Sequence, residues 1–296
     1  MAALQEHALR AVQMARYGMV IDVGRCVGCY SCFLACCDEH AGNDHLPVAI
    51  AQPQAGQKWI DVREDERGSF PRIRLSHIPV PCLHCAEAPC IAAGGGAVYR
   101  RDDGIVLLDT EKSVGKRVIV SACPHGVIFW NEARNIPQKC TFCAHLLDDG
   151  WKEPRCVEVC PTQAIAFGDL DDSASFVAKL NAADRTEELH PEYGLKPAVR
   201  YIGLPQRFVA GEVVLGDQTE IPAEGVRASL SGGGEVLVTT TDNYGDFVFE
   251  ELEDEFQYML RIEHSGYRPH QQVLRTRNDL NVGTIVLDFL GQAENT

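Results

Sequence analysis

Short runs of β-branched and aromatic residues recur from Arg207 to the end of the chain, with turn-forming residues between them. Apolar and polar positions that alternate over about four to eight residues predict half-buried strands. The runs are RFVAGEVVLG, GVRASLSGGG, EVLVTTTD, GDFVFEEL, FQYMLRIEHSGY, HQQVLRT and VGTIVLDFL. This pattern predicts an all-β domain, an antiparallel sandwich, over residues 207–296.

The pattern before residue 207 is different. Residues 1–16 place Leu4, Ala8, Leu9 and Val12 at helical spacing and predict an amphipathic N-terminal extension. Residues 38–81 are rich in Pro, Gly and charge and form an insertion. Further on, PTQAIAFGDL predicts a short strand, and DDSASFVAKLNAA predicts a helix capped by Asp172 or Ser173. The predicted domains are therefore 1–16, 17–206 and 207–296.

Length and charge narrow the function classes. The 296 residues include 27 Lys and Arg and 42 Asp and Glu, which gives a formal net charge of −15. Because sequence-independent binding of nucleic acid needs a basic surface, this charge excludes that function. The apolar runs fall far below the roughly 18 residues of a membrane span, so we expect no direct membrane span. The first residues show no export signal, which predicts a cytoplasmic location. A subunit exported on a partner's signal would look the same.

Cysteine is the informative residue, because all thirteen cysteines lie between Cys26 and Cys160. In a cytoplasmic chain such a set indicates metal rather than disulfides. The first group reads CxxCxxCxxxC, and the last reads CxxC, an insertion, then CxxxCP. In two-cluster ferredoxins the fourth cysteine of each run binds the other run's cluster. That rule gives two [4Fe-4S] sites: Cys26, Cys29, Cys32 and Cys160, and Cys140, Cys143, Cys156 and Cys36.

Structural zinc is the alternative to iron, and three other residues near the cysteine runs need an interpretation. Structural zinc would suit a CxxC pair, but zinc takes four ligands and does not explain the longer run or the Pro161 that follows it. Cys37 is left over and is interpreted as a small buried thiol. His84 and His125 either tune a cluster by hydrogen bonding or are simply solvated or packed imidazoles.

The middle of the chain contains CxxCxxxxC at Cys82, Cys85 and Cys90, and a single Cys123 before Pro124. With the outer groups, this pattern over residues 17–168 resembles the iron-sulfur subunits of the dimethyl sulfoxide reductase superfamily of Mo or W pterin oxidoreductases. The resemblance implies an α+β fold with a duplicated bacterial-ferredoxin-like domain. It also places family cysteines at four positions where this chain has none: Gly94, Ser113, Lys116 and Ile119.

By the crossover rule, all four vacancies belong to one cluster. The resemblance therefore implies that this site is lost and that a third [4Fe-4S] cluster remains, bound by Cys82, Cys85, Cys90 and Cys123. An apolar shell would come from neighbouring residues: Val27, Phe33, Leu34, Ile91 and Val127. In the family, insertions such as 38–81 contact the large subunit, so we expect this one to dock.

The C-terminal sandwich resembles the transthyretin-like, carboxypeptidase-regulatory type. Its Asp242, Asn243 and Asp246 are interpreted as turn formers rather than calcium ligands, and Gly94–Gly96 as a turn rather than a phosphate cradle. Three clusters with an appended sandwich resemble the small subunits of the pyrogallol-phloroglucinol transhydroxylase and anaerobic resorcinol hydroxylase type. This resemblance implies a heterodimer whose large subunit carries a bis-MGD Mo or W centre and acts on hydroxylated aromatic compounds.

The chain itself carries no motif of a catalytic site, so we expect an electron-transfer subunit that exchanges electrons with a donor or acceptor protein or small molecule. Two other functions stay open. One is an electron-transfer subunit of a respiratory, membrane-anchored molybdopterin enzyme, in which four clusters and no sandwich are usual. The other is a structural module that recruits partners and uses its clusters only to hold the fold.

Overall fold

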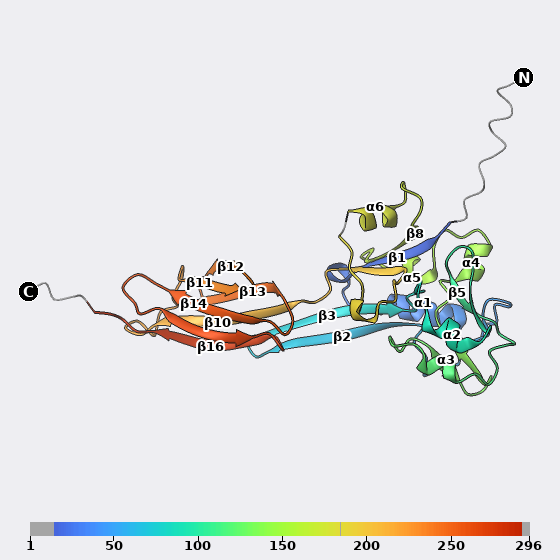
Figure 1. Ribbon diagram of the computed structural model, residues 1–296, viewed down its shortest axis with the longest axis horizontal. Helices are drawn as coiled ribbons and strands as arrows, with labels where there is room; N and C mark the ends of the chain where they lie inside the picture. The colour runs from blue at the N-terminus through green and yellow to red at the C-terminus, as the bar shows by residue number, and fades with distance from the viewer. Residues whose placement is uncertain (1–14, 184, 292–296) are drawn as a thin grey trace, which may run out of the picture. The chain divides into compact units, whose positions relative to one another are not determined.

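A computed structural model describes residues 15–183 and 185–291 (Figure 1). The helix expected over residues 1–16 falls outside the described residues, except for its last two positions. The chain divides into two compact units. The first comprises Met1–Glu64 and Ser76–Leu204, and the second comprises Asp65–Leu75 and Pro205–Thr296.

A three-stranded sheet in the first unit ties the outer cysteine groups together. β1 (Tyr17–Asp22) lies just before Cys26, and β8 (Ile165–Asp169) lies just after Cys160. The two strands pair antiparallel with Ile21 opposite Ile165, and β9 (Val199–Ile202) pairs with β1 in parallel. Because four residues of β1 are buried in succession, the strand is fixed in the core, and cysteines far apart in sequence are brought to one end of the sheet.

The other elements of the first unit are short, and loops carrying cysteines join them (Figure 1). The helices are η1 (Val23–Arg25), α1 (Ser31–His40), α2 (Pro89–Gly94), α3 (Val118–Ser121), α4 (Ala144–Asp148), α5 (Arg155–Glu158), α6 (Phe176–Ala182) and η2 (Pro191–Tyr193). The strand pairs are β4 (Val98–Arg100) with β5 (Val106–Leu108) and β6 (Phe129–Asn131) with β7 (Ile136–Gln138). On α1, Cys32 and Cys36 stand one turn apart, so both face the core.

The predicted strand and helix after Cys160 are both present, as β8 and α6. The predicted helix cap was wrong. Ser175 caps α6, and its hydroxyl accepts the Ala178 N–H at 3.3 Å. Asp172 instead accepts the Ala174 N–H at 2.8 Å, which forms a turn before the helix begins.

The predicted insertion 38–81 contains a hairpin of β2 (Ile60–Ser69) and β3 (Arg72–Pro81). Its residues 65–75 group with the second unit rather than with the cysteine-bearing one. Composition gave no signal for this assignment, because a charged hairpin reads like any exposed loop. The docking role of residues 38–81 stays a prediction.

The second unit contains two sheets, and all seven predicted strands are present. The first has the order β13 (Asp246–Leu252), β10 (Arg207–Leu215), β16 (Leu280–Leu287). The second has the order β12 (Glu235–Thr240), β11 (Arg227–Gly232), β14 (Gln257–Glu263), β15 (His270–Arg275). Buried apolar residues of both sheets, among them Val209, Val213, Leu230, Leu260 and Ile262, form a single core.

The prediction that this sandwich is antiparallel needs one correction. β10 and β16, the first and last strands, pair in parallel, with Val213 opposite Ile285. The chain crosses to the other sheet between them and returns to the open edge of β10 in the same direction. Sequence pattern reports strands but not their direction, so it could not reveal this pair. The turn at Asp242 is as predicted: its carboxylate accepts the N–H groups of Tyr244 and Asp246 at 2.9 and 3.0 Å.

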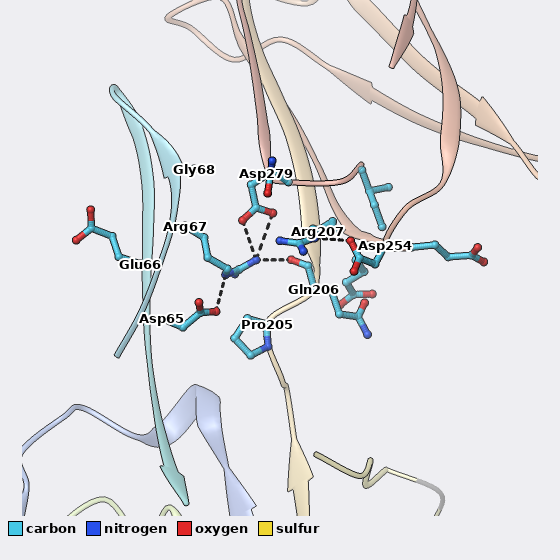
Figure 2. A pocket seen from close by; sticks show the side chains of 13 residues that line it. Asp65, Glu66, Arg67, Gly68, Pro205, Gln206, Arg207, Asp254 and Asp279 are labelled. Carbon is cyan, nitrogen blue, oxygen red and sulfur yellow. Dashed lines mark hydrogen bonds and ion pairs between the residues drawn. The ribbon is translucent and has the colours of Figure 1, made fainter. Parts of the chain in front are cut away.

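A polar pocket within the second unit is lined by the tip of β2, the start of β10 and the loops at Glu253 and Asn278 (Figure 2). Arg67 donates to the Gln206 carbonyl at 2.7 Å and to the buried Asp279 carboxylate at 3.2 Å. Arg207 pairs with Asp254 at 2.8 Å. Because both arginines are already paired, we interpret the pocket as the ionic anchor of residues 65–75 on the sandwich and not as a binding site.

Candidate metal centres

All thirteen cysteines are free thiols, and eight of them are buried. Six of the buried ones lie in the main core of the first unit, with Met19, Trp59 and Phe142, and Cys90 lies in a second apolar cluster. Buried thiols in a core that also brings them into groups are expected of metal ligands, whereas isolated buried thiols act as small apolar side chains.

The first group contains Cys26, Cys29, Cys32 and Cys160. Burial raises the pKa of Cys26, and negative charge on Cys160 and Cys29 raises it further. Burial likewise raises the pKa of Cys32 to about 12, with added repulsion from Cys26, Cys160 and Cys29. Cys29 itself is exposed, and a hydrogen bond with Ser31 lowers its pKa. Negative charge on one sulfur disfavours ionisation of the others because the fold gathers these four cysteines.

The second group contains Cys36, Cys140, Cys143 and Cys156, all of them buried. Burial raises the pKa of Cys36 well above its usual value, and repulsion from the other three thiols adds to the effect. Burial raises the pKa of Cys143 to about 12, and negative charge on Cys140 contributes. The fold therefore brings the fourth cysteine of the first run to the cysteines of the last run, as the crossover rule predicts.

The third group contains Cys82, Cys85, Cys90 and Cys123. Burial raises the pKa of Cys85 to about 12, with repulsion from Cys82, Cys123 and Cys90. Burial also raises the pKa of Cys90 to about 11, where Cys82 and Cys123 again contribute. The four residues line one small cavity with His84 and His125. Cys123 thus joins three cysteines that precede it by more than thirty residues.

Zinc fits these groups poorly. Zinc holds thiolates at about 2.3 Å, which places neighbouring sulfur atoms about 3.8 Å apart. Among the described residues, which include every cysteine, no three thiol sulfur atoms lie within 4.8 Å of one another. A cubane spreads its four thiolates over four different irons and needs the wider spacing.

Backbone N–H groups point at several of the sulfur atoms. The Phe142 N–H donates to Cys140 Sγ at 3.4 Å, and the Ala164 N–H donates to Cys160 Sγ at 3.2 Å. Phe142 has a positive φ of 53°, so the local chain turns back toward the sulfur. Donors of this kind stabilise the negative charge that a metal-bound thiolate carries.

Gly28 shows how closely the first cysteine loop is packed. Its φ is +65°, and a Cβ built there would lie 2.3 Å from the His77 ring. Only glycine satisfies both conditions. The sequence gave no sign that His77 lies against this glycine.

The three groups form a series. Cys32 of the first group adds to the raised pKa of Cys156 in the second. Cys82 of the third group adds to the raised pKa of Cys140 in the second, which burial brings to about 11. The second group therefore lies between the other two, and the vacant family positions do not separate the Cys82 group from the rest.

At the four positions where the family has cysteines and this chain has none, the residues present have other structural roles. Gly94 ends α2, and a Cβ there would meet Val98 at 2.6 Å. Ile119 is fully buried in an apolar cluster with Val98 and Cys90. Lys116 Nζ donates to the Gly94 carbonyl at 2.8 Å. Ser113 is fully buried, and its hydroxyl has no hydrogen-bond partner among the described residues.

Both histidines of the cysteine loops are buried, so they are packed rather than solvated. The Val106 N–H donates to His84 Nδ1 at 3.0 Å, which leaves the proton of a neutral ring on Nε2. That atom is buried and has no partner among the described residues, and the same holds for both ring nitrogens of His125. Burial lowers the pKa of His84 well below its usual value, and it lowers that of His125 to about 4.

Glu39, His45 and His145 bring their ligand atoms within 4.8 Å of one another. The His45 and His145 rings are stacked at 3.8 Å and nearly parallel, so their lone pairs do not converge on one ion. Nε2 of His145 lies 2.9 Å from the Glu39 carboxylate, and Nε2 of His45 lies 2.9 Å from its carbonyl. We interpret this trio as a hydrogen-bonded network beside the second group. Sequence reasoning did not find it.

Two expectations about the surroundings of the cysteines were wrong. Val27 and Leu34 were expected in the apolar shell, but they are 63% and 61% exposed. Cys37 was expected to be buried but is only partly so. Val127 is buried as expected. Apolar identity predicted burial for Val27 and Leu34, whereas the first loop lies at the surface of its unit.

Comparison with known proteins places this geometry in context. Residues 73–170 match the model of a 4Fe-4S dicluster domain. The chain is 41% identical to the small subunit of pyrogallol hydroxytransferase from Pelobacter acidigallici, over 93% of this chain and 100% of the relative. The chain belongs to the iron-sulfur subunits of the dimethyl sulfoxide reductase family. Members of this family carry [4Fe-4S] clusters and transfer electrons for molybdenum oxidoreductases, and this chain is such a subunit.

Other iron-sulfur subunits are more distant. The iron-sulfur subunit of a putative dimethyl sulfoxide reductase from Halobacterium salinarum is 36% identical over 64% of this chain and 79% of its own length. The iron-sulfur subunit of an arsenate respiratory reductase from Shewanella is 31% identical over 63% and 96%. The match to 5-hydroxyisourate hydrolase of Klebsiella pneumoniae has 22% identity, covers 27% of this chain and 89% of that one, and has a TM-score of only 0.24.

None of the helices in the described part of this family member combines the length and the apolar character that crossing a membrane requires. The match to the 4Fe-4S dicluster domain, over residues 73–170, includes none of the sandwich strands that begin at Arg207.

Proposed function

We propose that this subunit carries three [4Fe-4S] clusters, one in each cysteine group. The ligands are Cys26, Cys29, Cys32 and Cys160 for cluster 1, Cys36, Cys140, Cys143 and Cys156 for cluster 2, and Cys82, Cys85, Cys90 and Cys123 for cluster 3. The observation that carries the proposal is the closeness of four cysteines within each group, although each group draws on distant segments. Twelve ligands are used, and Cys37 remains.

We propose that electrons pass singly along the series 1, 2, 3. The proximity of Cys32 to Cys156 and of Cys82 to Cys140 supports this order, because electron transfer needs close neighbours. The chain supplies thiolate ligands, N–H donors to sulfur and an apolar surrounding, which together set the potential of each cluster. No substrate chemistry is assigned to its own residues.

The partner we propose is a large catalytic subunit that carries a Mo or W bis-MGD centre. Support comes from the similarity to the small subunit of pyrogallol hydroxytransferase along almost the whole chain. By the same similarity, the complex acts on hydroxylated aromatic compounds. The exposed Cys29, with Val27 and Leu34 beside it, gives cluster 1 an apolar surface through which electrons enter or leave the subunit.

We also propose that residues 17–206, apart from the hairpin residues 65–75 that group with the second unit, form the electron-transfer domain and that residues 207–296 form a transthyretin-like sandwich. The three-stranded and four-stranded sheets with a common core support this assignment. The sandwich has no proposed part in electron transfer.

The test is anaerobic purification of the complex, followed by measurement of iron, sulfide, molybdenum and tungsten. Three cubanes predict about 12 iron atoms per chain, with Mo or W only when a large partner is present. Cys123→Ser is expected to lower the iron content to about 8 by weakening cluster 3.

Matched substitution of the leftover thiol, Cys37→Ser, should leave the iron content unchanged. Loss of all three clusters in Cys123→Ser, or of none, would contradict the ligand sets. Zinc in place of iron would contradict the cofactor, and co-purification with a multi-span membrane protein would favour the respiratory alternative.

A further inference from the structure

Lys139 is the residue whose environment the proposed function leaves unexplained. It directly precedes Cys140, its side chain is only 1% exposed, and it is among the largest fully buried side chains. Lysine is almost never fully buried unless its charge is paired, because removing an ammonium from water costs several kcal/mol.

The groups that contact the Lys139 ammonium do not supply that charge. Nζ donates to the Val106 carbonyl at 2.5 Å and to the Cys140 carbonyl at 3.0 Å, and both acceptors are neutral. Within the described residues no carboxylate lies within 4.0 Å of it, although many other lysines and arginines there have such a partner. A buried cation without a protein anion indicates an anionic group that the protein itself does not contain.

The positions of the two acceptors identify that group. Val106 lines the cavity of the third cysteine group and packs in the same apolar cluster as Cys90, while Cys140 belongs to the second group. Lys139 therefore lies between two cysteine groups. A [4Fe-4S] cluster with four cysteine ligands is anionic overall, because the thiolates outweigh the positive charge of the cubane.

His84 adds no positive charge beside Lys139, and the other cation near it, Arg100, donates to the Cys85 carbonyl at 2.6 Å. Its Nδ1 accepts the N–H of Val106, the residue whose carbonyl accepts from Lys139. The ring is fully buried and lies against Phe142, which stands between Cys140 and Cys143, with the ring centroids 3.8 Å apart and the planes tilted by 31°. A neutral imidazole and a charged ammonium are thus held side by side by one residue of β5.

We propose that Lys139 is the buried counter-charge shared by clusters 2 and 3 and that it raises the reduction potentials of both. Reduction adds one electron, and so one unit of negative charge, to a cluster. A fixed cation nearby stabilises that added charge, and burial strengthens the effect because little water screens it. Among the described residues Lys139 is the one buried lysine or arginine, so cluster 1 has no such neighbour. The inference rests on the proposed ligand sets.

The experiment is an EPR-monitored redox titration of the purified complex carrying Lys139→Met. Methionine keeps most of the length of the side chain and removes its charge. We expect two of the three midpoint potentials to fall and the third to stay in place. Signals are assigned by their loss in Cys29→Ser for cluster 1 and in Cys123→Ser for cluster 3.

Two further variants separate charge from packing. Lys139→Arg keeps the charge and should restore both potentials toward those of the wild type. Lys116→Met is the matched control, because Lys116 also donates to backbone carbonyls of the same unit, and it should move none. If Lys139→Met fails to load its clusters, Lys139→Gln is titrated in its place.

Each outcome decides between the two proposals. A wild-type complex with fewer than three cubanes overturns the ligand sets. Three cubanes with unchanged potentials in Lys139→Met or Lys139→Gln overturn only the role of Lys139, as does an equal shift of all three potentials. Loss of clusters 2 and 3 in both neutral variants, with cluster 1 retained and Lys139→Arg fully loaded, supports the shared counter-charge.

Discussion

Gly28 illustrates what a single residue contributes to a cysteine loop. It holds a φ of +65° and faces the His77 ring, so a side chain there meets both backbone strain and a steric clash. Gly28→Ala is therefore expected to cost about 1 kcal/mol in backbone strain alone and more through the clash, and to displace Cys26 and Cys29 from cluster 1. Iron analysis should show about 8 iron atoms per chain in place of about 12.

Gly150→Ala is the control, because Gly150 also has a positive φ, of 92°, but a Cβ there would meet open space. Gly150→Ala should lower stability only through backbone strain and should retain its iron. If the two variants lose iron equally, the close packing against His77 is not what the loop requires.

At this scale the sequence identified the twelve proposed ligands by their spacing, because cubane ligation imposes a short, regular repeat. It could not identify Lys139 or His77. Nothing marks Lys139 as buried in the sequence, since a lysine beside a cysteine is ordinarily exposed. His77 meets Gly28 across almost fifty positions, a proximity that only the folded chain creates.

The element that replaces the lost cluster site is a short helix, α3, with the turn before it. Ile119 packs into the apolar cluster that contains Val98 and Cys90, while the buried Ser113 hydroxyl has no partner in the described structure. Ile119→Ala should lower the free energy of unfolding by about 2–5 kcal/mol. Ser113→Ala removes an unsatisfied polar group and should be neutral or stabilise the chain by about 1 kcal/mol.

Denaturant unfolding of the anaerobically purified protein measures both changes. Iron content serves as the internal control, since neither residue is a proposed ligand. Destabilisation by Ser113→Ala would mean that its hydroxyl has a hydrogen-bond partner after all, and this would return Ser113 to a functional role.

Elements were predicted unevenly, and the reasons are physical. The seven strands after Arg207 alternate apolar and polar residues, and turn residues bound them, so local pattern was sufficient. The parallel pairing of β10 with β16, and the grouping of residues 65–75 with the second unit, depend on long-range pairing. In the cysteine-bearing unit, most helices span only four to ten residues, so sequence periodicity is weak and motif spacing carries the information.

In the first unit as a whole, the three cysteine groups follow one another, with the second in the middle. Magnetic interaction between reduced clusters falls steeply with distance, so the fully reduced wild type should show EPR features of coupled neighbours. Cys143→Ser removes a ligand of the middle cluster. The remaining clusters 1 and 3 are then too far apart to couple strongly, and the spectrum should become the sum of two isolated signals.

Cys123→Ser gives the matched comparison, because it removes an end cluster and leaves clusters 1 and 2 as neighbours. Coupling should persist in that variant at the same iron content as in Cys143→Ser. If coupling survives in Cys143→Ser and disappears in Cys123→Ser, cluster 3 rather than cluster 2 lies in the middle. The electron path would then have to be redrawn through Cys82 and Cys90, whereas the position of Lys139 between clusters 2 and 3 would stand.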